Sequence, residues 1–443
     1  MAGDWPEETL GCLSSYLNRG AAPRYVNEGG MVVLNQKCIR DQRISFGSAR
    51  RTDHLLKPVS PERTLRQWDI LVNSTGVGTL GRVAQVNFLP EATTVDSHVT
   101  IVRPDPDAVD PRFLGFAIRA LETEVEALGE GSTGQTELSR TRLASLPIPL
   151  PQMSEQRAIA HILGTLDDKI ELNRRMSPTL EAMSQALCKA WFVDFEPVRA
   201  QAEGRDPGLP PQLAALFPDQ LVETAGEIMP DGWRLQPLKD HVDAEKGLSY
   251  KGSGLGEEGV PLHNLNSIYE GGGYKYEGIK YYSGDYKERH LVKPGDLIVA
   301  NTEQGHDRLL IGYAAIVPKS FGVHGIISHH IFRLRPKNKS PLSRNFICAL
   351  LNSPRMHEVV SGYSNGTTVN MLPVDGLQKP LVIVPPDGLI EAFDRLATSA
   401  EHRREEMVSE SHTLSALRGT LLPKLICGDL RVKDAETFLE RVL

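Results

Sequence analysis

Several short motifs in the sequence have residue types and spacings that could do chemistry. The run Gly76-Val77-Gly78-Thr79-Leu80-Gly81 is a literal GxGxxG, a loop that binds a dinucleotide pyrophosphate when a helix follows it. Here Arg82 to Phe88 alternates as a strand does, and the corresponding stretch from Asn301 to Asp307 lacks this glycine pattern. We therefore expect a glycine-rich hairpin or loop at this position and no dinucleotide.

Three further motifs could hold a phosphate or a metal, and none has a complete set of partners. Gly129 to Thr136 imitates a nucleotide-binding loop, but Gln135 stands where a lysine should neutralise the phosphate. Asp167-Asp168-Lys169 could suggest a nuclease metal site, yet it lies on a predicted helix without a separated acidic partner, which favours a solvated helix face. His329-His330 lacks a companion at zinc-ligand spacing. The Asn-Pro-Pro-aromatic and Asp-Pro-Pro-Tyr boxes of amino-methyltransferases are also missing. We expect no catalytic residue, no metal and no cofactor in this chain.

Basic side chains gather in one stretch of each half. The 443-residue chain has a net charge of −7, so binding to nucleic acid would need local basic patches. Residues 37–66 contain eight basic residues and three acidic ones, and residues 331–345 contain five basic residues and no acid. Each patch alone could be an ordinary solvated surface. Two patches, one in each half, favour a binding role.

The composition excludes membrane and secreted classes. No apolar run approaches the length of a transmembrane helix, and the acidic stretch Met1 to Glu8 is unlike a secretory signal. The five cysteines are never at CxxC spacing. An odd number of separated cysteines in a long chain predicts reduced thiols and a cytoplasmic protein.

An internal repeat predicts the order of the strands and helices that carry these motifs. Trp5 and Leu10 recur as Trp233 and Leu238, and His98–Pro104 recurs as His330–Pro336. Other matched pairs are Asn35 with Asn264, Asp69–Thr75 with Asp296–Thr302, and Gly134-Gln135-Thr136 with Gly366-Thr367-Thr368. In each half, short β-branched runs predict strands, short helices follow at about 111–128 and 343–357, and a proline-rich exit precedes a long helix.

The two long helices have heptad spacing. The first, from about Glu155 to Phe192, carries Ile159, Leu166, Asn173, Leu180 and Leu187 seven residues apart, and the second carries Phe393, Ala400, Met407, Leu414 and Leu421. Asn173 in this seam could fix its register, and Pro178 predicts a kink or a fresh helix start capped by Ser177. A pseudo-twofold relation between the halves would make the helices antiparallel. We therefore predict an α+β fold with two globular domains related by internal duplication, separated by two long helices forming an antiparallel coiled coil.

Several quoted stretches resemble one protein family. They are Leu146-Pro147-Ile148-Pro149-Leu150-Pro151, Glu155-Gln156-Arg157, Leu166-Asp167-Asp168-Lys169-Ile170, Ala190-Trp191-Phe192-Val193-Asp194-Phe195-Glu196-Pro197-Val198 and Pro230-Asp231-Gly232-Trp233. Together they resemble the central region of the specificity (S) subunit of type I restriction–modification enzymes. The family's duplicated layout matches the whole chain. The second copy departs at Asp387-Gly388, where no Glu-Gln pair follows the prolines.

The resemblance implies a non-catalytic subunit that recognises DNA. Each of two target-recognition domains would read half of a bipartite double-stranded target, and the coiled coil would fix the spacer at about one helical turn, on the order of 10 bp. The long helices would dock two modification subunits, which carry S-adenosylmethionine and methylate adenines. Restriction subunits that use ATP and Mg²⁺ would join the complex, and no membrane is involved.

Candidate residues follow from the basic patches, the polar strand ends and the heptads. The predicted DNA contacts are Arg43, Arg50, Arg51, Lys57 and Thr75 in the first half, and Lys275, Lys280, Tyr281, Lys287, Arg289, Gln304 and Arg308 in the second. Ordinary solvated side chains would account equally for part of this set. The predicted coiled-coil and docking residues are Ile159, Leu163, Leu166, Ile170, Leu180, Leu187, Phe393, Met407 and Leu414.

The predicted domain limits follow the same pattern. They are a first target-recognition domain at 1–153, a first long helix at 154–198, a linker at 199–232, a second target-recognition domain at 233–388, a second long helix at 389–426 and a tail at 427–443. Two alternatives stay open: a specificity subunit of a methylation-only or otherwise atypical system, and a coiled-coil scaffold that binds protein and not DNA.

Overall fold

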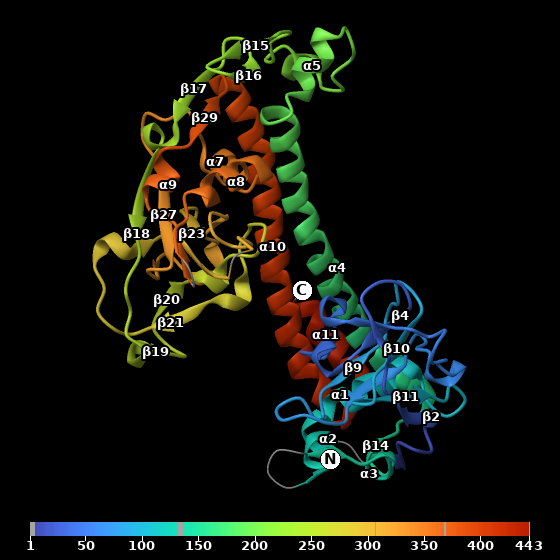
Figure 1. Ribbon diagram of the computed structural model, residues 1–443. Coiled ribbons are helices and arrows are strands. Elements are labelled where there is room, and N and C mark those ends of the chain that lie inside the picture. The colour runs from blue at the N-terminus through green and yellow to red at the C-terminus, as the bar shows by residue number, and fades with distance from the viewer. Residues whose placement is uncertain (1–4, 132–135, 306, 367–368, 443) are drawn as a thin grey trace. The chain divides into compact units, whose positions relative to one another are not determined.

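The computed structural model describes residues 5–131, 136–305, 307–366 and 369–442. The chain divides into two compact units (Figure 1): unit 1 contains residues 1–171 and 411–443, and unit 2 contains residues 172–410. Gln135 of the nucleotide-loop motif and the Thr367-Thr368 pair of the repeat lie outside the described residues.

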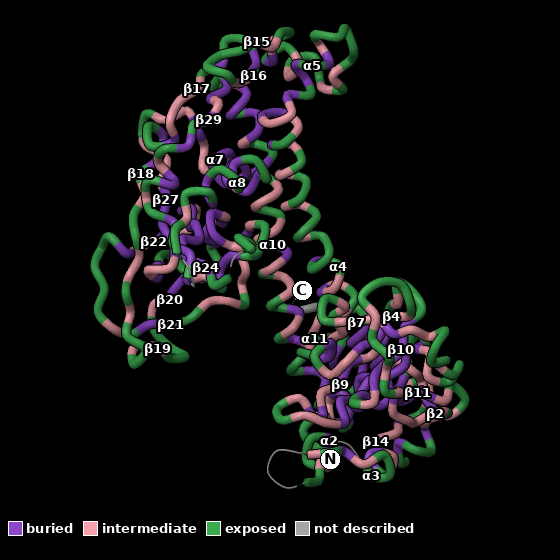
Figure 2. Tube along the Cα trace, in the orientation of Figure 1, coloured by how far each residue is buried: buried purple, intermediate pink, exposed green. Residues whose placement is uncertain are grey.

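Unit 1 is built on two four-stranded sheets. The first has the order β2 (Ser14–Arg19), β11 (Val99–Pro104), β8 (Ile70–Asn73) and β9 (Val83–Gln85), with antiparallel neighbours. The second has the order β10 (Thr93–Val95), β4 (Met31–Leu34), β7 (Arg50–Thr52) and β3 (Tyr25–Val26), with β10 and β4 parallel. All residues of β8 and β11 are buried (Figure 2) because these strands lie inside the sheet and both faces are covered.

Shorter elements complete unit 1. They are the strand pairs β1 (Glu7–Thr9) with β14 (Pro147–Pro149), β5 (Ile39–Arg40) with β6 (Arg43–Ile44) and β12 (Gly129–Glu130) with β13 (Glu137–Leu138), and the helices α1 (Pro111–Ala120), α2 (Glu122–Ala127), α3 (Arg140–Ala144) and α11 (Val432–Val442). The GxGxxG run is the loop between β8 and β9. The expected glycine-rich hairpin is confirmed, because a strand and not a helix follows the loop.

Unit 2 repeats this architecture. Its four-stranded sheet has the order β18 (Val242–Lys246), β27 (Ile331–Pro336), β23 (Leu297–Ala300) and β25 (Ala314–Ile316). Its second sheet has the order β19 (Leu255–Gly256), β21 (Lys280–Tyr282), β20 (Val260–His263), β26 (Gly325–Ile327) and β22 (Leu291–Val292), again with one parallel pair, β20 with β26. The internal duplication predicted from the sequence is thus confirmed in strand order.

The remaining elements of unit 2 are shorter. They are β17 (Arg234–Pro237) paired with β29 (Leu381–Val384), β24 (Thr302–Gln304) with β28 (Val369–Met371), β15 (Leu221–Thr224) with β16 (Glu227–Pro230), and the helices α5 (Glu196–Ala202), α6 (Pro211–Ala214), α7 (Arg344–Leu351), α8 (Pro354–Gly362) and α9 (Asp375–Gln378). The segment predicted as a linker therefore contains two short helices and a strand pair.

Two details of local chemistry recur in both units. The helix after the sheet is capped by a short polar side chain: Asp110 accepts from the Phe113 backbone at 2.9 Å, and Ser343 accepts from the Phe346 backbone at 3.1 Å. A strand arginine also pairs with a buried aspartate, because an aspartate 5% exposed or less would be costly without a partner. The pairs are Arg103 with Asp69 in unit 1 and Arg335 with Asp296 in unit 2.

The long helices are α4 (Met153–Phe192) and α10 (Asp387–Ile426), each 40 residues long and each divided between the two units. Within unit 2 they run antiparallel, because Glu181 forms an ion pair with Arg404 while Phe192 packs on Phe393, with ring centroids 5.5 Å apart. Asn173 is buried in this seam, and its Nδ2 donates to Oε2 of Glu410 at 2.6 Å. The antiparallel pairing is confirmed for this part of the helices.

Pro178 does not interrupt α4. The predicted fresh helix start at Ser177 is wrong, because α4 continues through the proline. Pro178 is exposed, so water can bond the carbonyl that loses its helical partner. The buried face of the helix meanwhile keeps its packing.

The aromatic residues of the family-like stretch are core residues of unit 2. Trp191 and Phe192 are 3% and 4% exposed, and Phe192 packs edge-to-face on Phe346 of α7 with ring centroids 4.9 Å apart. Phe195 contacts Trp233 in the same way, at 5.7 Å. These contacts pack the end of α4 and the residues after it against α7 and against Trp233, which directly precedes β17. This packing accounts for the aromatic side chains in this stretch.

Asp167 is half-buried and lies between two arginine side chains, which corrects the prediction of a solvated helix face for this residue. Its carboxylate accepts from Arg119 of α1 and from Arg418 of α10, each at 2.6 Å, and the side chain is 15% exposed. Burial alone would raise the pKa of this carboxyl, but the charges and hydrogen bonds of the two guanidinium groups hold the pKa below its usual value. Asp168, 63% exposed, pairs with Arg112 and fits the solvated expectation.

Unit 2 has a related contact between its first helix and its long helix. Arg344 of α7 pairs with Glu401 of α10 at 3.1 Å, and α7 lies beside α10 in Figure 1. Burial raises the pKa of the Glu401 carboxyl, with Arg344 opposing the shift. In both units, then, an arginine–carboxylate pair ties the domain helix to a long helix.

Candidate nucleic-acid interface

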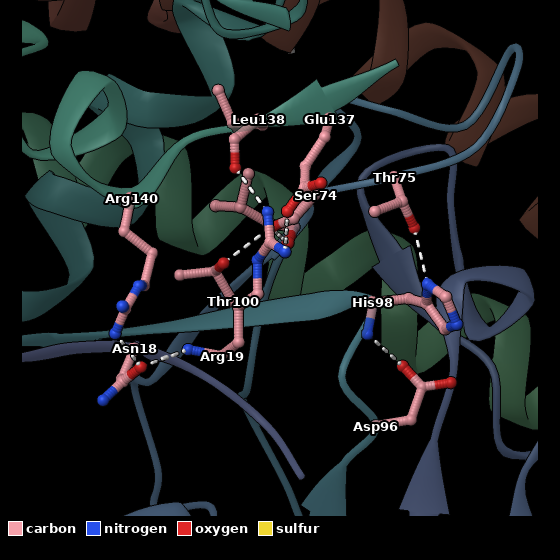
Figure 3. Close-up of polar contacts among 11 residues, drawn as sticks. Asn18, Arg19, Ser74, Thr75, Asp96, His98, Thr100, Glu137, Leu138 and Arg140 are labelled. Atoms are coloured by element: carbon pink, nitrogen blue, oxygen red, sulfur yellow. Dashed lines mark hydrogen bonds and ion pairs between the residues drawn. The ribbon is translucent and has the colours of Figure 1, made fainter. Parts of the chain in front are cut away.

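A Thr–His hydrogen bond lies at the same place in both units. In unit 1, Thr75 follows β8, and its Oγ1 is 2.7 Å from Nδ1 of His98, which precedes β11 (Figure 3). In unit 2, Thr302 and His330 stand at the equivalent positions, with the same two atoms 2.9 Å apart. His98 is exposed and His330 is half-buried. The repeat therefore preserves one pair of polar side chains at the surface end of the central strands.

The backbone around this pair is also the same in the two units. β2 ends at Arg19 and β18 ends at Lys246, and a glycine follows each. A Cβ on Gly20 would lie 2.1 Å from the carbonyl oxygen of Val95, and a Cβ on Gly247 would lie 2.2 Å from that of Ser328. Only glycine permits this close approach. A basic residue and a glycine thus accompany the Thr–His pair in each half.

The loops beside the pairs differ between the units. In unit 1 the loop is the short glycine-rich run from Gly76 to Gly81, with Val77 78% exposed at its tip. In unit 2 the loop begins after β24, which ends at Gln304, and buried Glu303 shapes its later part by accepting backbone N–H bonds from Leu309 at 2.7 Å and Leu310 at 3.2 Å. Arg308, at φ 53°, and Leu309, 47% exposed, lie on its outer side.

A polar depression lies beside the unit 1 pair. Arg19, Arg63, Ser97, Glu137 and Arg140 line it. Figure 3 shows Arg19 paired with Glu137, and Arg140 donating to Oδ1 of Asn18 at 2.6 Å. Buried Asp96 accepts from the His98 backbone at 2.9 Å, and burial raises the pKa of its carboxyl. The depression therefore contains cationic, donor and acceptor groups that suit a polar, extended ligand.

The predicted contacts of unit 1 lie on different elements. Arg43 is on β6, Arg50 and Arg51 are on β7, and Lys57 follows that strand. Arg50 stacks over the ring of Tyr25 at 3.4 Å, Arg51 pairs with Glu91, and Lys57 donates to the Ala22 carbonyl. Of the predicted set, Thr75 alone is a member of the Thr–His pair.

In unit 2 the predicted contacts form two sets. Lys280 and Tyr281 are on β21, with Lys275 before it and the exposed Lys287 and Arg289 after it. Gln304 is the last residue of β24, and Arg308 is on the loop that follows. Sequence reasoning did not include His98, His330, Arg19 or Lys246. A signal was present, because the two histidines stand at the same offset in the repeat as the segments that follow them.

Most of the predicted coiled-coil and docking residues are buried within the chain. Ile159, Leu163, Leu166, Ile170, Phe393, Met407 and Leu414 are each 4% exposed or less, and Leu180 and Leu187 are half-buried. These side chains pack the helix seam and the domain cores. The larger apolar groups exposed on α4 are Leu172 at 49%, Met176 at 38% and Met183 at 56%.

Neither a membrane-spanning helix nor a group of metal ligands occurs in the described part of the chain. Among the described residues, no helix is both long and apolar enough to cross a membrane. Within the same part of the chain, no three histidine, cysteine, aspartate or glutamate side chains are grouped as ligands of a metal ion would be.

Comparison with known proteins gives consistent relatives. Residues 60–182 match the family model described as the type I restriction modification DNA specificity domain. The chain is 24% identical to the type I restriction enzyme HindI specificity subunit of Haemophilus influenzae, over 96% of this chain and all of that protein. It is 24% identical to the MjaIX specificity subunit of Methanocaldococcus jannaschii, over 84% of this chain and 82% of that one.

A solved structure is also similar in fold. The type I restriction-modification system S subunit from M. genitalium superposes with a TM-score of 0.57 at 16% identity, covering 96% of each chain. This match confirms the predicted fold class. The family model and the two relatives confirm the resemblance noted in the sequence.

Proposed function

We propose, on the premise that the chain carries the DNA specificity domain of type I restriction–modification enzymes, that it is the specificity subunit of such a complex. Units 1 and 2 each read one half of a bipartite double-stranded DNA target. The chain is non-catalytic and cytoplasmic. Modification subunits supply S-adenosylmethionine and methylate adenine, and restriction subunits supply the ATP- and Mg²⁺-dependent reaction.

The observation that carries the proposal is the repeated surface end of the central strands. Each unit presents a Thr–His pair beside a basic residue, with hydrogen bonds of 2.7 and 2.9 Å. The adjoining loops differ in sequence. The same arrangement of strand ends with a different loop in each unit suits a protein that binds two different half-sites of one DNA. Contacts to base edges vary with sequence, whereas contacts to phosphates do not.

The first experiment is to map methylated adenine along host DNA with and without this gene. We expect deletion to remove methylation at one motif with two half-sites separated by about one turn of DNA, on the order of 10 bp. An unchanged pattern in a strain whose modification subunit is active would contradict the proposal. A protein-binding scaffold gives that unchanged pattern, and its purified complex does not bind DNA even at low salt.

We further propose that the exposed stripe of α4 docks a modification subunit. Leu172, Met176 and Met183 are spaced by four and seven residues, which places them within about 40° of one another around the helix. Three large apolar side chains on one exposed helix face are typical of an interaction surface.

Changing this stripe is expected to weaken assembly without unfolding the chain. The double variant Met176→Glu/Met183→Glu places two charges in the proposed interface, and we expect the affinity for the modification subunit to fall by at least about 30-fold, or ~2 kcal/mol. Titration of one labelled subunit with the other measures this change. Ala182→Glu, also at an exposed position of α4, is the matched control. Equal assembly of the double variant and the control would place docking elsewhere.

A further inference from the structure

We infer that the imidazoles of His98 and His330 each bind a phosphate group of the DNA backbone, whereas the loops beside them contact the bases. The inference rests on the proposed function and assigns a separate role to each part of the site. Neither histidine is among the DNA contacts predicted from the sequence.

One set of polar side chains recurs in both units. Two domains that read different half-sites must differ where they touch bases, but they face the same sugar–phosphate backbone. The shared set is Thr75, His98 and Arg19 in unit 1, and Thr302, His330 and Lys246 in unit 2. The neighbouring loops, Gly76–Gly81 and the one that follows Gln304, differ in sequence and glycine content. The shared groups therefore suit the ligand that does not vary.

The second argument comes from the hydrogen bond itself. When the threonine hydroxyl donates to Nδ1, the neutral imidazole carries its proton on Nε2, which is then a donor of fixed direction. Phosphate oxygens are acceptors, so this tautomer suits a phosphate. The opposite tautomer would leave Nε2 as an acceptor and could not bond one. The threonine is thus a positioning residue, and the histidine makes the contact.

Charges around each ring have to be considered as well. In unit 1, Arg19 is paired with Glu137, and the Asp96 carboxylate is occupied by the His98 backbone N–H. In unit 2, burial, followed by the electrostatic effects of His329 and Lys246, lowers the pKa of His330. The ring of His330 is therefore neutral at pH 7, and its contact is a hydrogen bond without net charge.

The third argument is exposure. His98 is exposed, and a hydrogen bond between two side chains at the surface contributes little to stability. In unit 1, stability alone therefore gives little reason to keep this pair. A ligand that accepts a hydrogen bond from the exposed ring does give such a reason.

The test measures DNA binding by the complete complex of this chain with its modification subunits. The probes are a fluorescent duplex with the mapped target and a duplex with both half-sites scrambled. We expect His98→Ala and His330→Ala each to weaken binding to both duplexes by the same factor, about 5- to 10-fold. The methylated motif stays unchanged. For His330→Ala the slope of log affinity against log salt also stays unchanged, since no charge is lost.

Matched variants separate this role from others. His98→Gln keeps an amide donor near the position of Nε2, and we expect it to bind within about twofold of the wild-type complex. Thr75→Val should weaken binding in the same direction as His98→Ala. Val77→Ser, in the loop, should instead lower affinity for the target duplex alone. His161→Ala, at an exposed position of α4, should change neither.

Several outcomes would overturn the inference. One is equal binding by His98→Ala and the wild-type complex, or a fall in thermal stability without a change in affinity. Another is a loss confined to the target duplex with a changed methylated motif, which would assign the histidine to base contact. A wild-type complex that binds neither duplex would overturn the proposed function itself, so the two failures are distinguishable.

Discussion

Leu166→Asp is expected to unfold unit 1 and not merely to disturb assembly. Leu166 is 4% exposed and packs in the core formed by α1, α4 and α10. The substitution removes the buried leucine and places a carboxylate without a partner in an apolar environment. Truncating a buried leucine costs about 2–5 kcal/mol, and an unpaired buried charge adds several more. The sum is comparable with the whole stability of a domain, about 5–15 kcal/mol.

The measurement is urea denaturation of the purified chain followed by circular dichroism and limited proteolysis. Proteolysis distinguishes the units, because we expect new cleavage within residues 5–171 while unit 2 stays protected. Leu172→Asp is the control: it lies six residues further along the same helix and is 49% exposed, so its effect should stay within about 0.5 kcal/mol. A Leu166→Asp chain of normal stability would remove Leu166 from the core and return it to the docking surface.

Asp167→Asn is expected to lower the free energy of unfolding of unit 1 by about 3 kcal/mol. The carboxylate lies between Arg119 and Arg418, whose side chains are 7% and 17% exposed. Removing its charge leaves two nearly buried guanidinium groups without a counter-ion, and breaking such a pair typically costs about 3–5 kcal/mol. The asparagine keeps one acceptor, so the lower end of this range is expected.

The neighbouring residue supplies the control for this variant. Asp168 pairs with Arg112 at 3.0 Å but is 63% exposed, and exposed pairs contribute about 0–1 kcal/mol. Asp168→Asn should therefore change stability by less than about 1 kcal/mol. Equal losses of stability for the two variants would contradict the ion pairs of Asp167 with Arg119 and Arg418.

The effect of Asp167→Asn should also depend on pH in a defined direction. The pKa of Asp167 is lowered in the folded chain, so the folded state favours the ionised carboxylate more than the unfolded state does. The resulting stability is present above the unfolded pKa, about 4, and is lost as pH falls through the lower folded pKa. The difference between wild-type and variant chains should accordingly shrink at acid pH. A difference that grew on acidification would contradict the assigned ion pairs.

The sequence predicted most of the architecture because the relevant signals are periodic or repeated. Heptad positions such as Ile159 and Leu166 indicated the long helices, and the offset between His98 and His330 indicated the duplicated domains. Pro178 led to the wrong prediction of a fresh helix start, because the tendency of proline to break helices was considered without the packing of the buried helix face. Tertiary packing of this kind overrides local preference.

The candidate site was harder to predict for a physical reason. Asp167 looked solvated because its two arginine partners stand 48 and 251 residues away in the chain, and no local pattern indicates them. The Thr–His pairs likewise join residues 23 and 28 apart. Counting charged residues selected Arg50 and Lys57. It could not select a histidine whose proposed role depends on the hydrogen bond between its Nδ1 and a threonine hydroxyl.

The division of the chain between the units also has a consequence for biosynthesis. Unit 2 is one continuous segment, but unit 1 needs residues 411–443, whose Leu414, Leu421 and Leu425 are buried in its core and whose Arg431 stacks over Trp5. A ribosome adds about 5–20 residues per second, so the first part of unit 1 waits on the order of 10 to 50 s for its last helices. The half made first is thus completed only after unit 2 has been synthesised, and until residues 411–443 have been made the core side chains that they cover stay without this packing.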